Sequence, residues 1–362
     1  MASLLRVLVV DDSAVVRQGV LALLQHVPGM VVEVASDPLI AKQKMKSQRP
    51  DVILLDLEMP RMDGLTFLRE LMREDEPVPV VVCSGLAGPG SETAVRALEE
   101  GALEIIAKPQ LGVGEFLRES RARLVQALRN AARARSRLVR RGTPVKEEPE
   151  RPERLERPER PPLSMLTVTT DIVVAVGAST GGTEALRQLL ERMPPDCPGI
   201  VIVQHMPEQF TSAFAKRLHE LCRIEVKEAE QGDRVQQGRA LIAPGNRHLR
   251  VRRTGGHYQV ELMDGGRVSG HKPSVDVLFQ SVARAAGENA VGVLLTGMGE
   301  DGADGLLAMK EAGAETLAQD EASCVVFGMP RAAIQRGAVD EVVSIRGMTD
   351  AVLRRARRAR VH

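Results

Sequence analysis

Residues 171–190 read DIVVAVGASTGGTEALRQLL. The segment joins an apolar run, typical of a buried strand, to an amphipathic helical pattern through a glycine-rich turn. Ser179 lies in that turn between Gly177 and Gly181, in the spacing G-x-S-x-G that exposes a serine hydroxyl on a sharp strand-to-helix turn. Glycines suit the turn because its backbone angles exclude most side chains. The segment predicts an α/β unit with a nucleophilic serine at the carboxyl end of a strand.

A phosphate-binding loop is the alternative interpretation of the same turn, since glycines before a helix amino terminus bind anions equally well. No Lys-Ser or Lys-Thr pair ends the loop here, and the glycine spacing is not G-x-G-x-x-G. These two differences favour the serine interpretation.

The strand-then-helix pattern recurs along both halves of the chain. Strands are expected at residues 6–10, 31–35, 51–56, 78–83 and 103–107, and again at 171–177, 199–205 and 290–297. Five such units in about 125 residues imply a parallel sheet with helices on both faces. Residues 238–264 are polar and glycine-rich, which indicates a β-hairpin insertion. Both halves are therefore expected to be α/β.

A charged segment divides the two halves. Residues 144–163 read PVKEEPERPERLERPERPPL, in which 17 of 20 residues are proline or charged, and such a segment is expected to be an extended linker. Residues 129–141 hold six arginines and no acid, which we interpret as a solvated helix end rather than a nucleic-acid patch. The expected division is residues 1–125, a basic helix end with linker at 126–165, and residues 166–362.

Composition excludes several classes of protein. The net charge of the 362 residues is +1, and residues 166–362 carry no net charge, which argues against nucleic-acid binding. No apolar run approaches the 18 or so residues of a membrane span, so a cytoplasmic location is expected. The cysteines show no C-x-x-C spacing, which predicts reduced thiols; they are Cys83, Cys197, Cys222 and Cys324.

Polar residues end four of the five expected strands in the first half. They are Asp11 and Asp12, Asp56, Ser84 and Lys108. The carboxyl ends of parallel strands share one edge, so these side chains should converge there. Three crowded carboxylates repel unless a divalent cation keeps them ionised, and oxygen-only ligands favour Mg²⁺. Asp56 is then a candidate nucleophile toward phosphorus, with Ser84 and Lys108 contacting the phosphoryl group.

The first half resembles a known family through these residues. Asp11-Asp12-Ser13, LLDLEMPRMDGL at 54–65, Ser84-Gly85 and Lys108-Pro109 resemble the receiver domain of bacterial response regulators over residues 1–125. The resemblance implies a flavodoxin-like (βα)5 fold and phosphoryl transfer from a histidine kinase to Asp56. It also implies Mg²⁺ binding by Asp11, Asp12, Asp56 and the backbone carbonyl of Glu58. Receivers often carry an aromatic residue three positions before the lysine, where this chain has Ile105.

A nucleophilic serine in the second half needs a base and an orienting carboxylate. Of the seven histidines, only His205 immediately follows an apolar strand run. Asp301 follows the strand at 290–297 through a short loop and is the candidate orienter, with Asp304 as its competitor.

Backbone N–H groups of Thr180 and Gly181, at the start of the helix, are candidate donors to an oxyanion, and Met298 is a weaker one.

The second half resembles the catalytic domain of the chemotaxis protein-glutamate methylesterases, the CheB family. The motifs are GASTGGTEAL, QHMP, APG, HKPSVDVLF, LTGMGEDGADGLLAM and EASCVVFGMP, within residues 168–345. The resemblance implies a three-layer α/β fold with Ser179, His205 and Asp301 as the catalytic residues, and no cofactor for the ester chemistry. It implies demethylation of glutamate γ-methyl esters on methyl-accepting chemoreceptors, release of methanol, and deamidation of receptor glutamines. Membrane contact would come only through the receptors.

The resemblance also implies that the unphosphorylated receiver covers the active site and that phosphorylation by a chemotaxis histidine kinase opens it. The linker is longer than is usual in that family. The alternative is a response regulator whose second half binds a nucleotide or a partner without catalysis. A DNA-binding output is disfavoured by the charge of residues 166–362.

Overall fold

The computed structural model of the chain describes residues 4–59, 63–85, 89–108, 114–141 and 172–359. The expected linker at 144–163 lies outside these residues and stays a prediction. No helix among the described residues is long and apolar enough to cross a membrane.

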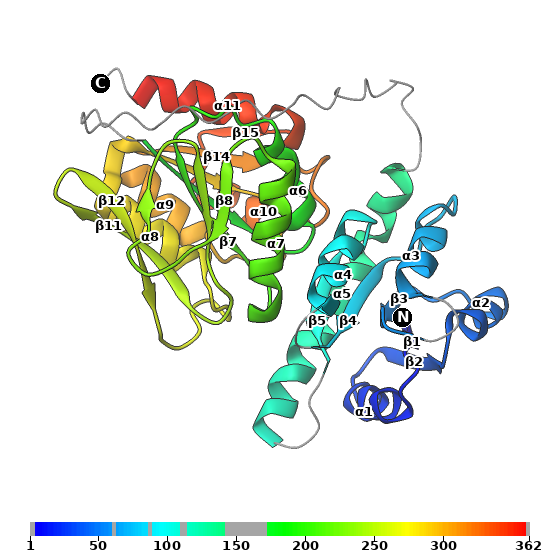
Figure 1. Ribbon diagram of the computed structural model, residues 1–362. Coiled ribbons are helices and arrows are strands. Elements are labelled where there is room, and N and C mark those ends of the chain that lie inside the picture. The colour runs from blue at the N-terminus through cyan, green and yellow to red at the C-terminus, as the bar shows by residue number, and fades with distance from the viewer. Residues whose placement is uncertain (1–3, 60–62, 86–88, 109–113, 142–171, 360–362) are drawn as a thin grey trace.

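The first unit, blue to cyan in Figure 1, is a five-stranded parallel sheet with the order β2-β1-β3-β4-β5. Its strands are β1 (Leu5–Val10), β2 (Met30–Ala35), β3 (Val52–Leu55), β4 (Val80–Ser84) and β5 (Glu104–Ala107). Its helices are α1 (Ala14–Leu24), α2 (Pro38–Ser47), α3 (Gly64–Met72), α4 (Pro89–Glu99) and α5 (Gly114–Arg141). The expected (βα)5 fold is confirmed.

Local sequence explains where these helices begin. Ser13, Asp37 and Asp63 precede α1, α2 and α3, and each side chain accepts a hydrogen bond from a backbone N–H of the first turn. The strands β3 and β4 consist wholly of buried residues, as central strands of a sheet covered on both faces must.

The second unit contains a seven-stranded sheet with the order β15-β14-β13-β6-β7-β10-β8, in which every neighbouring pair is parallel. Its strands are β6 (Val173–Ala178), β7 (Gly199–Gln204), β8 (Glu225–Glu228), β10 (Arg239–Ile242), β13 (Ala290–Leu294), β14 (Glu315–Gln319) and β15 (Glu341–Val343). Its helices are α6 (Gly182–Glu191), α7 (Glu208–Leu221), α8 (Val275–Ala286), α9 (Ala303–Glu311), α10 (Met329–Gln335) and α11 (Ile345–Ala359), with a 3-10 turn, η1 (Gly287–Asn289).

Alternation along β6 builds a core on each face of this sheet. Val174 and Val176 pack into the cluster that includes α6, α7 and α11. Val173 and Ala175 point the other way, into the cluster with α8, α9 and α10. The expected three-layer α/β architecture is therefore confirmed.

The insertion at 238–264 differs in part from the expected β-hairpin. Residues 248–263 do form a hairpin of β11 (His248–Thr254) and β12 (His257–Met263), to which β9 (Arg234–Val235) adds a third strand. Residues 239–242 instead form β10, which lies in the main sheet between β7 and β8. The apolar run Ala240–Ile242 is fully buried there, and burial on both faces outweighs the polar character of its surroundings.

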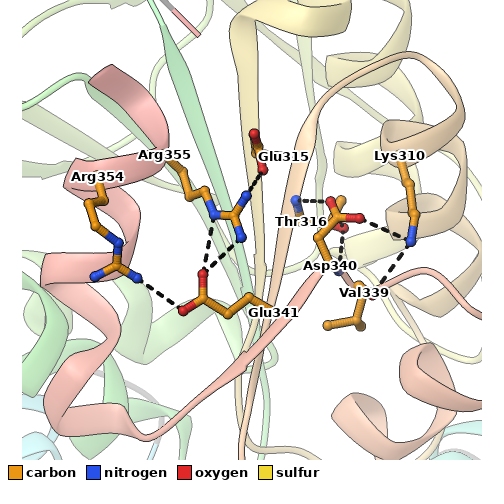
Figure 2. Close-up of polar contacts among 8 residues, drawn as sticks. All are labelled: Lys310, Glu315, Thr316, Val339, Asp340, Glu341, Arg354 and Arg355. Carbon is orange, nitrogen blue, oxygen red and sulfur yellow. Dashed lines mark hydrogen bonds and ion pairs between the residues drawn. The ribbon is translucent and has the colours of Figure 1, made fainter. Parts of the chain in front are cut away.

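Charged residues attach α11 to the edge of the sheet, as Figure 2 shows. Arg354 donates to Glu341 at 3.0 Å, and Arg355 donates to Glu341 at 2.9 Å and also to Glu315. These guanidinium groups hold the pKa of the Glu341 carboxyl below its usual range. The C-terminal helix is thereby paired with both β14 and β15.

The two units contact each other through α4 and α5, which face the second unit in Figure 1. At the α4–α7 contact Lys216 pairs with Glu92 at 2.9 Å, and Arg217 pairs with Glu99 at 2.6 Å. Helix α5 continues to Arg141, across the expected division at residue 125. The solvated helix end expected at 129–141 is wrong for its first residues: Asn130, Ala131 and Ala134 are buried, and Asn130 contacts Thr180 of the second unit.

Replacing Phe279 by Ala tests the core that supports α8. Phe279 is fully buried, so the substitution should lower the free energy of unfolding by about 3–5 kcal/mol. Tyr258 is the only tyrosine, the chain has no tryptophan, and Tyr258 lies in β12, so its fluorescence in urea reports on the second unit alone. In the control, Val342→Ala at a half-exposed position should change the value by less than about 0.5 kcal/mol. Equal effects of the two substitutions would contradict the assigned core.

Candidate active site and phosphorylation site

Three neighbouring strand ends bring the predicted serine, histidine and aspartate together. Ser179 directly follows β6, which lies between β7 and β13 in the sheet. His205 directly follows β7, and its backbone N–H donates to the carbonyl of Ala178 at 3.1 Å. Asp301 lies in the loop between β13 and α9. All three residues are therefore at the carboxyl edge of the sheet, where open α/β sheets place their ligands.

The Asp301 carboxylate is the most firmly held group of this site. It is 1% exposed and accepts four hydrogen bonds. The donors are His205 Nε2 at 2.8 Å, Ser274 Oγ at 2.7 Å, and the backbone N–H groups of Val275 at 2.8 Å and Asp276 at 3.1 Å. The two backbone donors belong to the first turn of α8, whose amino terminus favours negative charge.

These hydrogen bonds keep Asp301 ionised. Burial alone would raise its pKa, but the hydrogen bonds from His205 and from the start of α8 outweigh burial and lower the pKa below its usual value of 3.8. Asp301 is thus a carboxylate at neutral pH. The competing candidate, Asp304, lies on the surface and pairs with Arg336 at 2.7 Å, away from the histidine.

The ring of His205 has one nitrogen engaged. Nε2 contacts Asp301, whereas Nδ1 is buried and has no hydrogen-bond partner among the described residues. Ser179, His205 and Met298 line one pocket. Nδ1 is therefore the nitrogen left to accept a proton from a serine in this pocket.

Glycines permit this close arrangement at two positions. Gly181 begins α6 with a φ of +75°, and a Cβ there would lie 2.5 Å from the side chain of Val325. A Cβ on Gly297 would lie 2.8 Å from the Cβ of Ser179. A larger residue would therefore collide with Val325 at the first position and with Ser179 at the second.

The first unit covers one of the predicted oxyanion donors, the Gly181 N–H, and also contacts the side chain of Thr180. The backbone N–H of Gly181 donates to the carbonyl of Leu103 at 3.4 Å, and the Thr180 hydroxyl donates to the Glu104 carboxylate at 3.1 Å. Asn130 of α5 also lies 3.4 Å from the Thr180 hydroxyl. The third predicted donor, Met298, lines the same pocket. Because Glu104 is surrounded by protein, burial raises its pKa above the usual range.

Sequence reasoning missed three residues of this pocket: Glu104, Asn130 and His271. Glu104 and Asn130 belong to the first unit, and no motif links them to the serine turn. His271 lies in a polar insertion, and its ring stacks on that of His205. Ile105, at the position often aromatic in receivers, is buried and lines the pocket too.

The predicted carboxylate cluster forms at the carboxyl edge of the first sheet. Ligand atoms of Asp11, Asp12 and Asp56 lie within 4.8 Å of one another. Lys108 Nζ lies 2.7 Å from Asp56 and 3.0 Å from Asp11. The backbone N–H of Glu58 donates to Asp56 at 3.4 Å.

These residues fit a divalent cation. Burial raises the pKa of Asp56 even though Lys108 contacts it, so a single lysine does not offset the cost of burying this carboxylate. A hard cation with oxygen ligands would do so. Ser84 is fully buried at the same edge, and its hydroxyl has no hydrogen-bond partner among the described residues.

The two sites together define a class of protein: a response regulator whose output unit carries serine, histidine and aspartate at neighbouring strand ends. Comparison with known proteins agrees. Residues 7–115 match the family model of the response regulator receiver domain, and residues 174–352 match that of the CheB methylesterase.

Similar proteins extend over nearly the whole chain. A protein-glutamate methylesterase/protein-glutamine glutaminase of Geobacter metallireducens is 56% identical over 351 residues, which cover 97% of this chain and 98% of the relative. One of Anaeromyxobacter dehalogenans is 58% identical over 352 residues, covering 97% and 99%. The crystal structure of the Thermotoga maritima CheB methylesterase catalytic domain is 35% identical, with a TM-score of 0.50, and covers 51% of this chain and 97% of that domain. The chain belongs to the CheB family of protein-glutamate methylesterases and protein-glutamine glutaminases.

Proposed function

We propose that this protein hydrolyses glutamate γ-methyl esters on methyl-accepting chemoreceptors, and deamidates receptor glutamines, when its first unit is phosphorylated. The observation that carries the proposal is the His205–Asp301 bond beside Ser179, in a chain that belongs to the methylesterase family. The cytoplasmic location expected from the sequence is part of the proposal.

The proposed reaction proceeds through an ester of Ser179. Ser179 Oγ bonds to the γ-carbonyl carbon of the substrate while its proton passes to His205 Nδ1. The bond to the methoxy group then breaks, and that group takes the proton from His205 and leaves as methanol. Water, deprotonated by His205, attacks the acyl group, and the returning proton restores the Ser179 hydroxyl. With a glutamine substrate, ammonia leaves in place of methanol.

Asp301 fixes His205 for both steps. Its carboxylate holds Nε2–H, which keeps Nδ1 free of a proton and directed away from Asp301, and its charge stabilises the imidazolium that forms. The N–H groups of Thr180, Gly181 and Met298 are the proposed donors to the negative oxygen of the intermediate. Ester hydrolysis by this route needs no metal or organic cofactor.

The first unit is proposed to restrain the second when unphosphorylated. Leu103 accepts from Gly181 N–H, so a substrate cannot use that donor until the units separate, and Glu104 holds the neighbouring Thr180 hydroxyl. Glu104 begins β5, and Lys108, which contacts Asp56, directly follows the end of the same strand. Strand β5 therefore connects the phosphorylation site to the contacts at Thr180 and Gly181.

Asp56 is the proposed acceptor of the phosphoryl group from a chemotaxis histidine kinase. Its carboxylate oxygen bonds to phosphorus as the bond from phosphorus to the histidine nitrogen breaks. Asp11, Asp12, Asp56 and the backbone carbonyl of Glu58 would hold Mg²⁺, which when bound offsets the charge of the carboxylates and the phosphoryl group. Lys108 and Ser84 lie at the same edge and are the proposed contacts of the phosphoryl oxygens.

The alternative is a second unit that binds a nucleotide or a partner without catalysis. Substitutions of the proposed catalytic residues distinguish it from an esterase. Ser179→Ala should abolish release of tritiated methanol from methyl-labelled receptor membranes, because no other nucleophile is assigned. Asp301→Asn should lower the rate about 10⁴-fold, because the histidine loses its orienting charge. The control, Asp304→Asn, removes only a surface pair with Arg336 and should keep the rate within about twofold. A Ser179→Ala variant with most of the activity left would exclude this mechanism.

Phosphorylation is tested with a small phosphodonor and Mg²⁺ in the same assay. The donor should raise methanol release by the natural protein. Asp56→Asn removes the acceptor carboxylate and should leave only basal activity, with and without the donor. Basal activity itself serves as the folding control. Full activation of Asp56→Asn by the phosphodonor would disprove the proposal that phosphorylation of Asp56 raises esterase activity.

The restraining role of the hydrogen bond between Thr180 and Glu104 is tested without any phosphodonor. Glu104→Ala removes the acceptor of the Thr180 hydroxyl, so the open form should become more populated and basal activity should rise about three- to tenfold. The control is Glu92→Ala, which breaks an exposed pair between the same two units and should change activity by less than about twofold. Equal basal rates for Glu104→Ala and the natural protein would show that this contact does not restrain the enzyme.

A further inference from the structure

A second histidine lies face to face with the proposed base. The rings of His205 and His271 are stacked, with their centres 3.7 Å apart and their planes within 3° of parallel. The side chain of His205 is 9% exposed. One face of the imidazole is therefore covered by another imidazole, while the ring edge carrying Nε2 contacts Asp301.

Backbone and side-chain bonds fix the position of His271. Val268 and His271 exchange two backbone hydrogen bonds, at 3.0 and 2.9 Å, across a tight turn. Both turn residues, Ser269 and Gly270, have positive φ, at +52° and +79°. The Ser269 hydroxyl donates to Asp276 at 2.9 Å. The turn is thereby tied to the first turn of α8.

The start of α8 also holds Asp301, through Ser274, Val275 and Asp276. Asp276 itself accepts from the backbone N–H of Gly305 at 2.7 Å, which ties the arrangement to α9. Residues 268–276 consequently contact both partners of the His205–Asp301 pair: they bind the carboxylate and cover the ring.

We propose that His271 is a positioning residue for ester hydrolysis: its ring, stacked on His205, fixes the plane of that imidazole so that Nδ1 stays directed into the serine pocket. The inference rests on the proposed function. A hydrogen bond from Nε2 alone leaves the ring free to rotate about the line through that bond. Stacking against a second flat ring removes this rotation, and a misplacement of Nδ1 of about 1 Å can lower the rate about 100-fold.

The charge of His271 agrees with such a role. The groups that act on it are His205, Asp301, Arg267 and Arg123. Burial lowers the pKa of His271 and the charge of His205 lowers it further, against the opposite effect of Asp301, to about 4. His271 is thus uncharged at neutral pH. A neutral ring can remain stacked when His205 takes the serine proton, whereas a protonated one would repel the imidazolium.

The experiment compares His271→Ala, His271→Phe and the control His257→Ala in the full-length protein. His257 lies in β12 and contacts Gln259. Three quantities are measured: kcat and KM for methanol release, the rate at which a serine-directed fluorophosphonate labels Ser179, and unfolding followed by Tyr258 fluorescence. The fluorophosphonate needs the base but no receptor contacts.

We expect His271→Ala to lower kcat and the labelling rate about 10- to 100-fold with KM within about twofold, because the base is misplaced while the substrate site is intact. His271→Phe restores a flat ring and should recover both rates to within about threefold. Phenylalanine cannot take a proton, so the rate of His271→Phe relative to the natural protein should rise as the pH falls from 7 toward 4. His257→Ala should leave every quantity unchanged.

Three results would overturn the inference. The first is a labelling rate of His271→Ala equal to that of the natural protein. The second is a loss of labelling in His271→Ala that His271→Phe does not restore. The third is a rise in KM alone, which would make His271 a substrate contact. In each case the natural protein is still labelled at Ser179. Absence of labelling at Ser179 in the natural protein, with or without phosphodonor, would instead overturn the proposed function. Unfolding of His271→Ala in less urea than His271→Phe would not change these criteria, because the rates are compared on folded protein.

Discussion

The structure of the second unit depends on one buried carboxylate. Asp301 is almost completely enclosed, and an unpaired charge there would cost several kcal/mol. Four hydrogen bonds offset this cost, and three of them come from the start of α8. The carboxylate therefore joins the loop after β13 to α8, and through Nε2 of His205 it also joins the end of β7.

The hydrogen bonds to Asp301 also determine which nitrogen of His205 is available to the serine. Asp301 takes Nε2, so Nδ1 is left for the serine, and the stacked ring of His271 covers one face of the imidazole. At the serine turn, the Gly181 N–H donates to Leu103 and the Thr180 hydroxyl donates to Glu104, both of the first unit. In the proposed mechanism, the restraint uses Gly181 N–H, which is also a proposed oxyanion donor.

Much of this could be predicted from the sequence. The strand runs and the polar residues after them predict which side chains share a sheet edge, because parallel strands align their carboxyl ends. That rule places Ser179 and His205 together, as it does Asp11, Asp56 and Lys108. It does not distinguish Asp301 from Asp304, since both lie near the start of one helix, and only the position of α8 decides which of them reaches the histidine.

The remaining features arise from packing between distant segments. Glu104 and Asn130 enter the pocket because α5 and β5 meet the serine turn, and no local pattern encodes a contact between two folded units. The arginines of residues 129–141 indicate a solvated helix, but Ala131 and Ala134, which lie between them, are buried. Strand β10 could not be predicted from local sequence either, because its four residues are too few to show a hydrophobic period within a polar segment.

The most direct test of the central claim is the rate at which a serine-directed fluorophosphonate modifies the phosphodonor-treated protein, with the labelled residue identified by mass spectrometry. The account predicts one label per chain, on Ser179, and a rate that falls about 10⁴-fold when Asp301 is replaced by Asn. Labelling at another residue, or equal rates for the two proteins, would contradict it.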